Sequence, residues 1–389
     1  MKTSIIKYRK IIGRLVLPLL AAMVLFSSCD DWTDLESKYE PDQIGLGEGK
    51  DEAYYANLRA YKATMRDRKI SWGWYSGWTA EGSYMLNSLA GVADSLDIIA
   101  LWGSNWKRMT PAMAADLKYV KEVKGTKVIT THLMGGINWL DYLPEDVPED
   151  KWEEWYGWEG ELRPKNSYGS DDTWVAVTEK QEAAIRKYTR LFAQEIIDAG
   201  LDGVDFDWEG SDTKGTLASY QNRIWVFIDE LSTIMGPKSG SDMFLILDGH
   251  ANAINPKIAP YFDLFVWQAY NATTMSSLNT SFTSTVNNFK DYLTPEEIAP
   301  KFVVTANYEQ GMNLTGGRAA TLDDGTKVNS LKLMALWNPT YNGITYPRSG
   351  GAGAFHVEYE YAVAATNGFK GFYPWTREAI QVMNPAGIE

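Results

Sequence analysis

The sequence has a single cysteine, Cys29, in 389 residues. One thiol cannot form an intramolecular disulfide or a thiolate metal cluster, so the fold has to rest on an ordinary hydrophobic core. Histidine is nearly as scarce, with three residues in the chain. His132 and His250 lie near the ends of predicted strands, but neither has the spacing of a metal-ligand pair. We therefore expect no metal and no other cofactor.

Positive charge is also scarce, because 37 Lys and Arg face 50 Asp and Glu and the formal net charge is −13. Such a surface repels a phosphate backbone and has no basic stripe, so we expect no nucleic-acid partner. Long apolar runs are missing too. The run at 15–26 is too short to span a bilayer comfortably, and we expect contact with a membrane only through a lipid anchor.

Residues 1–29 resemble a targeting segment. Positively charged residues lead into the apolar run, which ends in Ser27-Ser28-Cys29, and this ending resembles a bacterial lipoprotein processing site. We predict a lipoprotein signal peptide over 1–29, lipidation of Cys29, an acidic tether over 30–60 and a folded domain over 61–389. The protein is then expected in the cell envelope, as a monomer anchored to the outer membrane, with the cell surface as one destination. A lone core cysteine is the alternative for Cys29.

From about Asp51 the chain alternates short apolar runs with helical patterns, which is typical of βα units. Eight runs qualify as strands, and eight strands that alternate with helices predict a single-domain α/β fold, the (β/α)8 TIM barrel. The predicted strands are Ile70–Tyr75, Ile98–Trp102, Lys127–Leu133, Gly203–Trp208, Met243–Leu247, Leu264–Ala269, Phe302–Ala306 and Gly371–Pro374.

Two predicted helices have recognisable starts. Thr110 is an N-cap followed by Pro111 at the first helical position. Thr178 opens a capping box with Gln181, and Gly200 stops that helix. Between the last two predicted strands we expect further helices around Ser330–Leu336 and around Ala354–Ala365.

The third connection of the predicted barrel, from Gly135 to Val177, is unusually long and rich in tryptophan and tyrosine. Loops at the carboxyl ends of barrel strands carry function. We prefer to interpret these aromatic residues, Trp139 among them, as a wall that contacts sugar rings. A packed surface flap is the alternative.

The segment Asp202–Glu209 carries a dense cluster of carboxylates. Side chains alternate faces along a strand, so Asp205, Asp207 and Glu209 share one face while hydrophobic residues share the other. Acids that point into a barrel are costly to bury unless they share protons or do chemistry. One of them should be forced neutral, and Glu209, at the carboxyl end on the longest side chain, is best placed as a general acid. Asp202 has the opposite parity and is expected to shape the strand entrance.

The same spacing of acids occurs at the start of a calcium-binding EF-hand loop. The position that needs a bidentate glutamate is Thr216 here, and the bulky Phe206 and Trp208 alternate with the acids. These residues favour a buried strand over a calcium loop.

The segment Asp202-Gly203-x-Asp205-x-Asp207-x-Glu209 resembles the DGxDxDxE motif of glycoside hydrolase family 18, and the resemblance extends over roughly 69–377. Gln268-x-Tyr270, on the sixth predicted strand, is similar to the Gln-x-Tyr of the family's endo-β-N-acetylglucosaminidases. The family's chitinases usually have Met-x-Tyr-Asp there, and Asn271 replaces that Asp. The third strand departs from the family, because Leu133–Gly136 keeps only the glycines of the usual SxGG.

This resemblance implies a substrate-assisted mechanism with retention of configuration. Glu209 would act as acid and then as base, Asp207 would orient the acetamide nitrogen, and Asp205 would hold Asp207. Gln268 and Tyr270 would bind the acetamide oxygen, the alternative being that they merely satisfy the barrel interior. We expect sugar contacts from Trp375, which resembles the tryptophan under the family's −1 subsite, and from Trp72, Tyr75, Trp139 and Asn271.

The activity implied is cleavage of the β-1,4 bond in the chitobiose core of N-glycans, with N-linked glycans of glycoproteins as the partners. A non-catalytic glycan-binding lipoprotein on the same scaffold is one alternative, although the retained Glu209 favours an enzyme. A chitinase is the other alternative.

Overall fold

A computed structural model describes residues 50–82, 85–134, 138–162, 174–209, 217–369 and 371–385. The predicted signal peptide 1–29, the lipidation site Cys29 and most of the predicted tether lie outside the described residues. The chain divides into two compact units, and the larger one consists of Glu52–Glu81 and Met85–Glu389.

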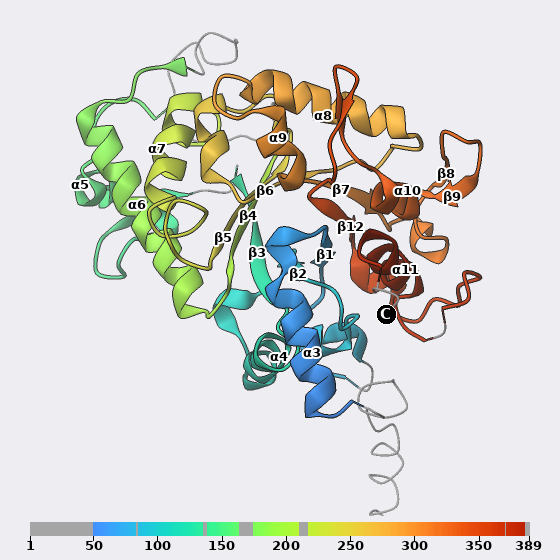
Figure 1. Ribbon diagram of the computed structural model, residues 1–389. Coiled ribbons are helices and arrows are strands. Elements are labelled where there is room, and N and C mark those ends of the chain that lie inside the picture. Colours follow the sequence, from blue (N-terminus) through green and yellow to red (C-terminus); the bar gives the residue numbers. More distant parts are fainter. Residues whose placement is uncertain are drawn as a thin grey trace, which may run out of the picture. The chain divides into compact units, whose positions relative to one another are not determined.

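The larger unit is a closed barrel of eight parallel strands with helices around it (Figure 1). The strands follow the order β1-β12-β7-β6-β5-β4-β3-β2, and β1 closes the barrel by pairing with both β2 and β12. This architecture confirms the predicted (β/α)8 TIM barrel. The barrel strands are β1 (Ile70–Tyr75), β2 (Ile98–Leu101), β3 (Lys127–Leu133), β4 (Gly203–Trp208), β5 (Phe244–Gly249), β6 (Leu264–Trp267), β7 (Phe302–Asn307) and β12 (Gly351–Phe355).

Seven strands lie where the sequence predicts them, but the predicted eighth strand is wrong. Gly371–Pro374 leads into a helix, and the eighth strand is β12, which ends at Phe355. Of the helix expected around Ala354–Ala365, the structure has a short 3₁₀ helix, Val357–Glu360. The sequence of β12, Gly-Ala-Gly-Ala-Phe, lacks the β-branched residues that mark strands. Its small residues are needed, because a Cβ on Gly353 would lie 2.1 Å from the backbone oxygen of Trp72 in β1.

The helices outside the barrel follow their sequence signals. Thr110 accepts a hydrogen bond from the Met113 amide, 3.2 Å away, and Thr178 forms the predicted capping box with Gln181. The helix around Ser330–Leu336 is confirmed. No helix in the described part of the chain is long and apolar enough to cross a membrane. The helices are α3 (Glu52–Ala63), α4 (Pro111–Glu122), α5 (Trp152–Tyr156), α6 (Glu179–Asp198), α7 (Gln221–Leu231), α8 (Met275–Phe289), α9 (Pro295–Ile298), α10 (Ser330–Leu336) and α11 (Pro374–Met383), with two-stranded sheets β8 (Ala319–Thr321) with β9 (Lys327–Asn329) and β10 (Thr340–Tyr341) with β11 (Ile344–Thr345).

Helix α3 begins earlier than the sequence analysis places the folded domain. Its residues 52–60 were assigned to the tether, yet Leu58 is buried and the Arg59 guanidinium donates to the Val123 carbonyl over 3.0 Å. The weak apolar pattern of the helix hides this contact in the sequence. The folded domain therefore includes residues from Glu52 onward.

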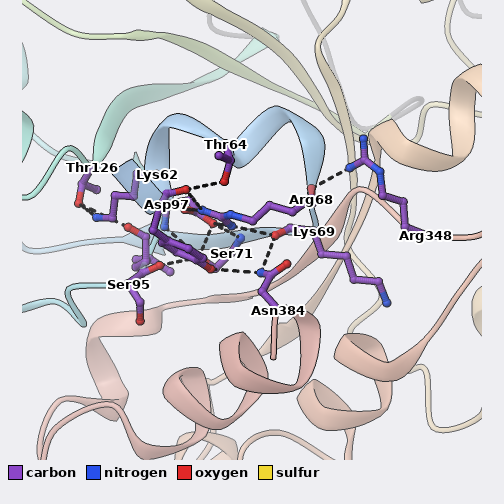
Figure 2. A network of polar contacts seen from close by, with 12 residues as sticks. Lys62, Thr64, Arg68, Lys69, Ser71, Ser95, Asp97, Thr126, Arg348 and Asn384 are labelled. Atoms are coloured by element: carbon purple, nitrogen blue, oxygen red, sulfur yellow. Dashed lines mark hydrogen bonds and ion pairs between the residues drawn. The ribbon is translucent and has the colours of Figure 1, made fainter. Parts of the chain in front are cut away.

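A buried polar network closes the barrel at the amino-terminal ends of β1 and β2 (Figure 2). The Asp97 carboxylate accepts hydrogen bonds from Arg68 at 2.6 and 2.8 Å, and from the amide and hydroxyl of Ser71, both at 2.9 Å. On the next layer the buried Lys62 donates to Thr126, and burial lowers the pKa of Lys62 to about 7. Hydrogen bonds and the Arg68–Asp97 ion pair thus hold this end of the barrel together.

Replacing Asp97 by asparagine is expected to lower the free energy of unfolding by about 3 kcal/mol, because the nearly buried Arg68 loses its ionic partner. Urea denaturation measures this loss. The matched control is Asp291→Asn on an exposed site. Equal unfolding midpoints for the two variants would contradict this role for Asp97.

Candidate active site

The carboxylates predicted to be catalytic lie at the carboxyl end of β4. Asp205 and Asp207 point into the barrel, while Phe206 points out and stacks on Phe192 of α6 with ring centres 5.8 Å apart. This confirms the predicted alternation. Glu209 follows the last residue of β4 directly and is partly exposed. The site therefore has two buried acids, Asp205 and Asp207, followed by the partly exposed Glu209 at the end of the same strand.

Asp202 lies at the opposite end of β4. Its carboxylate accepts a hydrogen bond from the Val128 amide at 2.9 Å and pairs with Lys121 at 3.3 Å and Lys127 at 3.4 Å. This confirms that Asp202 shapes the strand entrance.

Asp205 is completely buried and anchored on one oxygen. Its Oδ2 accepts hydrogen bonds from the indole of Trp74 at 2.9 Å and from the hydroxyl of Thr131 at 3.1 Å. Burial, followed by the charge of Asp207, raises the pKa of Asp205 to about 8. Burial and the charge of Glu209 raise the pKa of Asp207 to about 7. The two aspartates are thus interacting groups with raised pKa values, as their spacing along the strand predicts.

Carboxyl groups with raised pKa values lower the free energy of unfolding when the pH is high enough to ionise them in the unfolded chain. An unfolded aspartate ionises near pH 3.9, whereas folded Asp205 stays protonated up to about pH 8, so stability is lost as the pH rises between these values. Asp205→Asn removes this loss. We expect the variant to be more stable than the original protein by a few kcal/mol at pH 8, since each tenfold change in protonation is worth about 1.4 kcal/mol.

Thermal unfolding at pH 5 and pH 8 checks this expectation. The gain should be clearly larger at pH 8, and the exposed control Asp242→Asn should change little at either pH. A gain that is independent of pH would show that Asp205 does not hold a raised pKa.

Gln268 and Tyr270 adjoin the carboxylates from the segment that follows β6. The Gln268 amide nitrogen donates to Asp207 at 3.2 Å and, at 3.4 Å, to Asp248 at the end of β5. Burial raises the pKa of the Tyr270 phenol, and the charges of Asp248, Asp207 and Glu209 raise it further. The phenol therefore remains a hydrogen-bond donor in the field of these acids.

Asp248 was missed by the sequence analysis, which ended the fifth strand at Leu247. Strand β5 continues to Gly249, and Asp248 lies opposite Asp207 in the parallel register. The signal was present, because Asp248 has the parity of Phe244 and Ile246, which both belong to the barrel core.

Aromatic rings form the floor beside these acids. Phe355, the last residue of β12, lies 6.0 Å from Tyr270 in a near-parallel stack, and edge-on to Trp74 at 6.1 Å and Trp102 at 5.6 Å. Since the Trp74 indole also donates to Asp205, the aromatic rings around Phe355 are in direct contact with the buried carboxylates.

Trp375 does not follow the eighth strand, so the premise for its place under the −1 subsite is wrong. It is the second residue of α11 and nearly buried, and its indole donates to the Leu314 carbonyl at 3.3 Å. Phe355 takes the position at the strand end that was predicted for Trp375. The error comes entirely from the misplaced eighth strand.

Two other predicted sugar contacts are enclosed by protein, and one is exposed. Trp72 is buried in the barrel core, one layer below Trp74, and Tyr75 faces outward and donates to the Ser88 carbonyl at 3.2 Å. Asn271 is exposed next to the site. Because side chains alternate along β1, Tyr75 lies on the opposite face from Trp74 and could have been excluded from the barrel interior. For Trp72, no sequence signal distinguishes a packed tryptophan from an exposed one.

Trp139 belongs to a packed aromatic cluster. Its ring stacks on Trp152 at 5.3 Å and contacts Tyr156, Trp158 and Tyr188 at 5.1 to 5.4 Å. The preferred interpretation of Trp139 as part of a sugar wall is therefore wrong, and the alternative, a packed flap, holds for this part of the loop. Within the described part of the same loop, Trp174 is the half-exposed tryptophan.

Metal binding has no support in the part of the chain that the structure describes, where no group of three or more His, Cys, Asp or Glu side chains is arranged to hold an ion. His132 packs edge-on against Phe192 and Phe206, and burial lowers its pKa to about 4.

Comparisons with known proteins show the family and agree with the fold. The family model of glycoside hydrolase family 18, BT1044-like, matches residues 36–382. A selenomethionine-containing variant of BT1044 is 25% identical with a TM-score of 0.63, and the match covers 85% of this chain and 93% of that one. No curated protein sequence matches the chain.

Two more distant structures share the fold. The apo form of an endo-β-N-acetylglucosaminidase from Cordyceps militaris is 20% identical with a TM-score of 0.57, and the match covers 86% of this chain and 97% of that one. A variant of that enzyme in complex with fucosyl-N-acetylglucosamine-Asn is 18% identical with a TM-score of 0.54 and the same coverage.

Proposed function

The chain belongs to glycoside hydrolase family 18, in its BT1044-like group, and on that premise we propose that it is an endo-β-N-acetylglucosaminidase acting on the chitobiose core of N-glycans. The observation that carries the proposal is the contact of Gln268 with Asp207 beside the partly buried Tyr270 phenol. This places an amide and a phenol next to the acid that would face an acetamide group. The Cordyceps relative was solved with a glycan fragment of the same class, which supports the choice of substrate.

The reaction runs through the substrate's own acetamide group. Glu209 gives its proton to the glycosidic oxygen as the acetamide oxygen attacks the anomeric carbon, and the bond to the leaving sugar breaks. Asp207 accepts the acetamide N–H and stabilises the positive charge that develops in the oxazolinium ring. Glu209 then takes a proton from water as the water oxygen attacks the anomeric carbon, and the bond from that carbon to the acetamide oxygen breaks. Two inversions at one carbon give net retention.

The buried aspartates prepare this step. Asp205 is fixed by Trp74 and Thr131, and its buried carboxyl interacts electrostatically with Asp207. The Phe355 ring offers an apolar face under the sugar that carries the reacting acetamide. Gln268 and Tyr270 bind the acetamide oxygen and limit its rotation, so attack begins from a favourable geometry.

A panel of N-glycopeptides with high-mannose, hybrid and complex glycans tests the proposal by mass spectrometry. We expect at least one of them to lose its glycan and keep a single N-acetylglucosamine on asparagine. Cleavage of chito-oligosaccharides with untouched glycopeptides would instead identify a chitinase. Binding of glycopeptides without any cleavage would identify a glycan-binding protein.

We also propose that the protein is a monomer, lipid-anchored to the outer membrane through Cys29. The support is the apolar run that ends at this cysteine, followed by an acidic stretch. Metabolic labelling with a fatty acid should mark the protein and should fail for Cys29→Ser. Labelling that persists in this variant would overturn the assignment.

A further inference from the structure

Asp248 is a fourth carboxyl group in the site, and the mechanism above does not use it. It is 1% exposed, and it lies opposite Asp207 across the β4–β5 ladder. Its Oδ2 receives the long contact from Gln268, while its Oδ1 has no hydrogen-bond partner among the described residues. A buried carboxylate with so few donors is expensive, whereas a neutral carboxylic acid in the same place costs far less.

The surroundings of Asp248 also disfavour a negative charge. Asp205 and Asp207 face it from β4, Glu209 follows them, and the Tyr270 phenol faces it from beyond β6. None of these groups is cationic. Burial, followed by the charges of Asp205 and Asp207, raises the pKa of Asp248 well above its ordinary value, and the hydrogen bonds from Gln268 and the Gly249 backbone offset only part of this rise.

The Gln268 amide links Asp248 to the reacting group. Its nitrogen has two hydrogens, and the structure directs them to Asp207 and Asp248. When a substrate acetamide arrives, its oxygen needs one of these hydrogens, and Asp207 is needed by the acetamide nitrogen. The contact with Asp248 is then the one that keeps the Gln268 amide in place.

We propose that Asp248 is a positioning residue that stays protonated at neutral pH, so that it anchors Gln268 without adding a charge beside Asp207. It acts through Gln268 and does not touch the substrate. The effect on turnover rests on the proposed function, but the protonation state does not.

Two variants distinguish the effect of a charge on Asp248 from the effect of its hydrogen bond to Gln268. Asp248→Asn has the shape and neutrality of the protonated acid and can still accept from Gln268, so kcat should stay within about threefold and the pH profile should not move. Asp248→Leu removes the acceptor, and kcat should fall about 100-fold with a much smaller change in KM, since a displaced positioning group costs about this much. Thermal unfolding confirms that both variants are folded.

Infrared difference spectra provide a readout that needs no substrate. At pH 7 the spectrum of the original protein minus that of Asp248→Asn should contain the band of a protonated carboxyl group. The matched control is Asp263→Asn, since Asp263 is buried but ion-paired with Arg66 and should give a carboxylate band instead.

Several outcomes would overturn the proposal. A carboxylate band for Asp248, or an Asp248→Asn variant as slow as Asp248→Leu, would show that the charge is required. Unchanged kcat and KM in a folded Asp248→Leu variant would show that Gln268 needs no anchor. If the original protein cleaves no N-glycopeptide, the proposed function fails, and the infrared result still decides whether Asp248 holds a proton.

Discussion

Replacing Glu209 by glutamine is expected to lower kcat for N-glycopeptide cleavage by about 10⁴-fold, the upper range for loss of a general acid and base. Glutamine keeps the size of the side chain and its hydrogen bonding, but it has no proton to give to the glycosidic oxygen. The partly exposed position of Glu209 at the end of β4 allows it to reach the bond that breaks. Binding rests on other groups, so the dissociation constant of the glycopeptide should change only a few-fold.

Rates from mass spectrometry and affinities from calorimetry measure the two effects separately. Glu296→Gln, an exposed change on α9, is the matched control and should behave like the original protein. Cleavage by Glu209→Gln at the original rate would sink the proposed mechanism. A large loss of binding together with rate would mean that Glu209 holds the substrate rather than protonating it.

The second large effect is expected for Asp207→Asn, with a loss of about 10³-fold in kcat, as for the removal of one group that stabilises the transition state. An asparagine cannot offer a negative charge to the acetamide nitrogen as the oxazolinium ring closes. Its side-chain oxygen can still accept from the Gln268 amide, so the loss reports the missing charge. Attack by the acetamide oxygen should therefore become the slow step.

A glycan oxazoline distinguishes this role from a general loss of activity. That substrate already contains the ring that Asp207 helps to form, so Asp207→Asn should turn it over with a much smaller deficit than the glycopeptide. Equal deficits for both substrates would place the function of Asp207 elsewhere, for example in the shape of the pocket.

The sequence predicted the carboxylates well because strand parity is a local rule. One run of alternating residues decides that Asp205 and Asp207 face the interior and Phe206 the helices, and the structure agrees. Helix starts such as Thr178 are local in the same sense. Asp248 obeys the same parity, and it was missed only because the end of its strand was placed two residues too early.

The failures concern properties that depend on distant parts of the chain. The residues of β12 are small because they pack against the backbone of β1, and the sequence of β12 itself carries no strand signal. Trp139 is buried by rings from α5 and α6, which no local pattern reveals. The error for Trp375 follows from the error for β12. Trp375 was assigned to the site because it follows the segment that was wrongly predicted as the eighth strand.

The pairing of β1 with β12 also has a consequence for how the chain folds. These strands are separated by most of the sequence, so the last contact of the barrel has a high contact order and can form only when nearly the whole chain is available. Until then, β1 and β7 remain open edges on which another chain could add a strand. A truncation before Gly351 lacks the strand that closes the barrel, so it should aggregate rather than yield a smaller barrel.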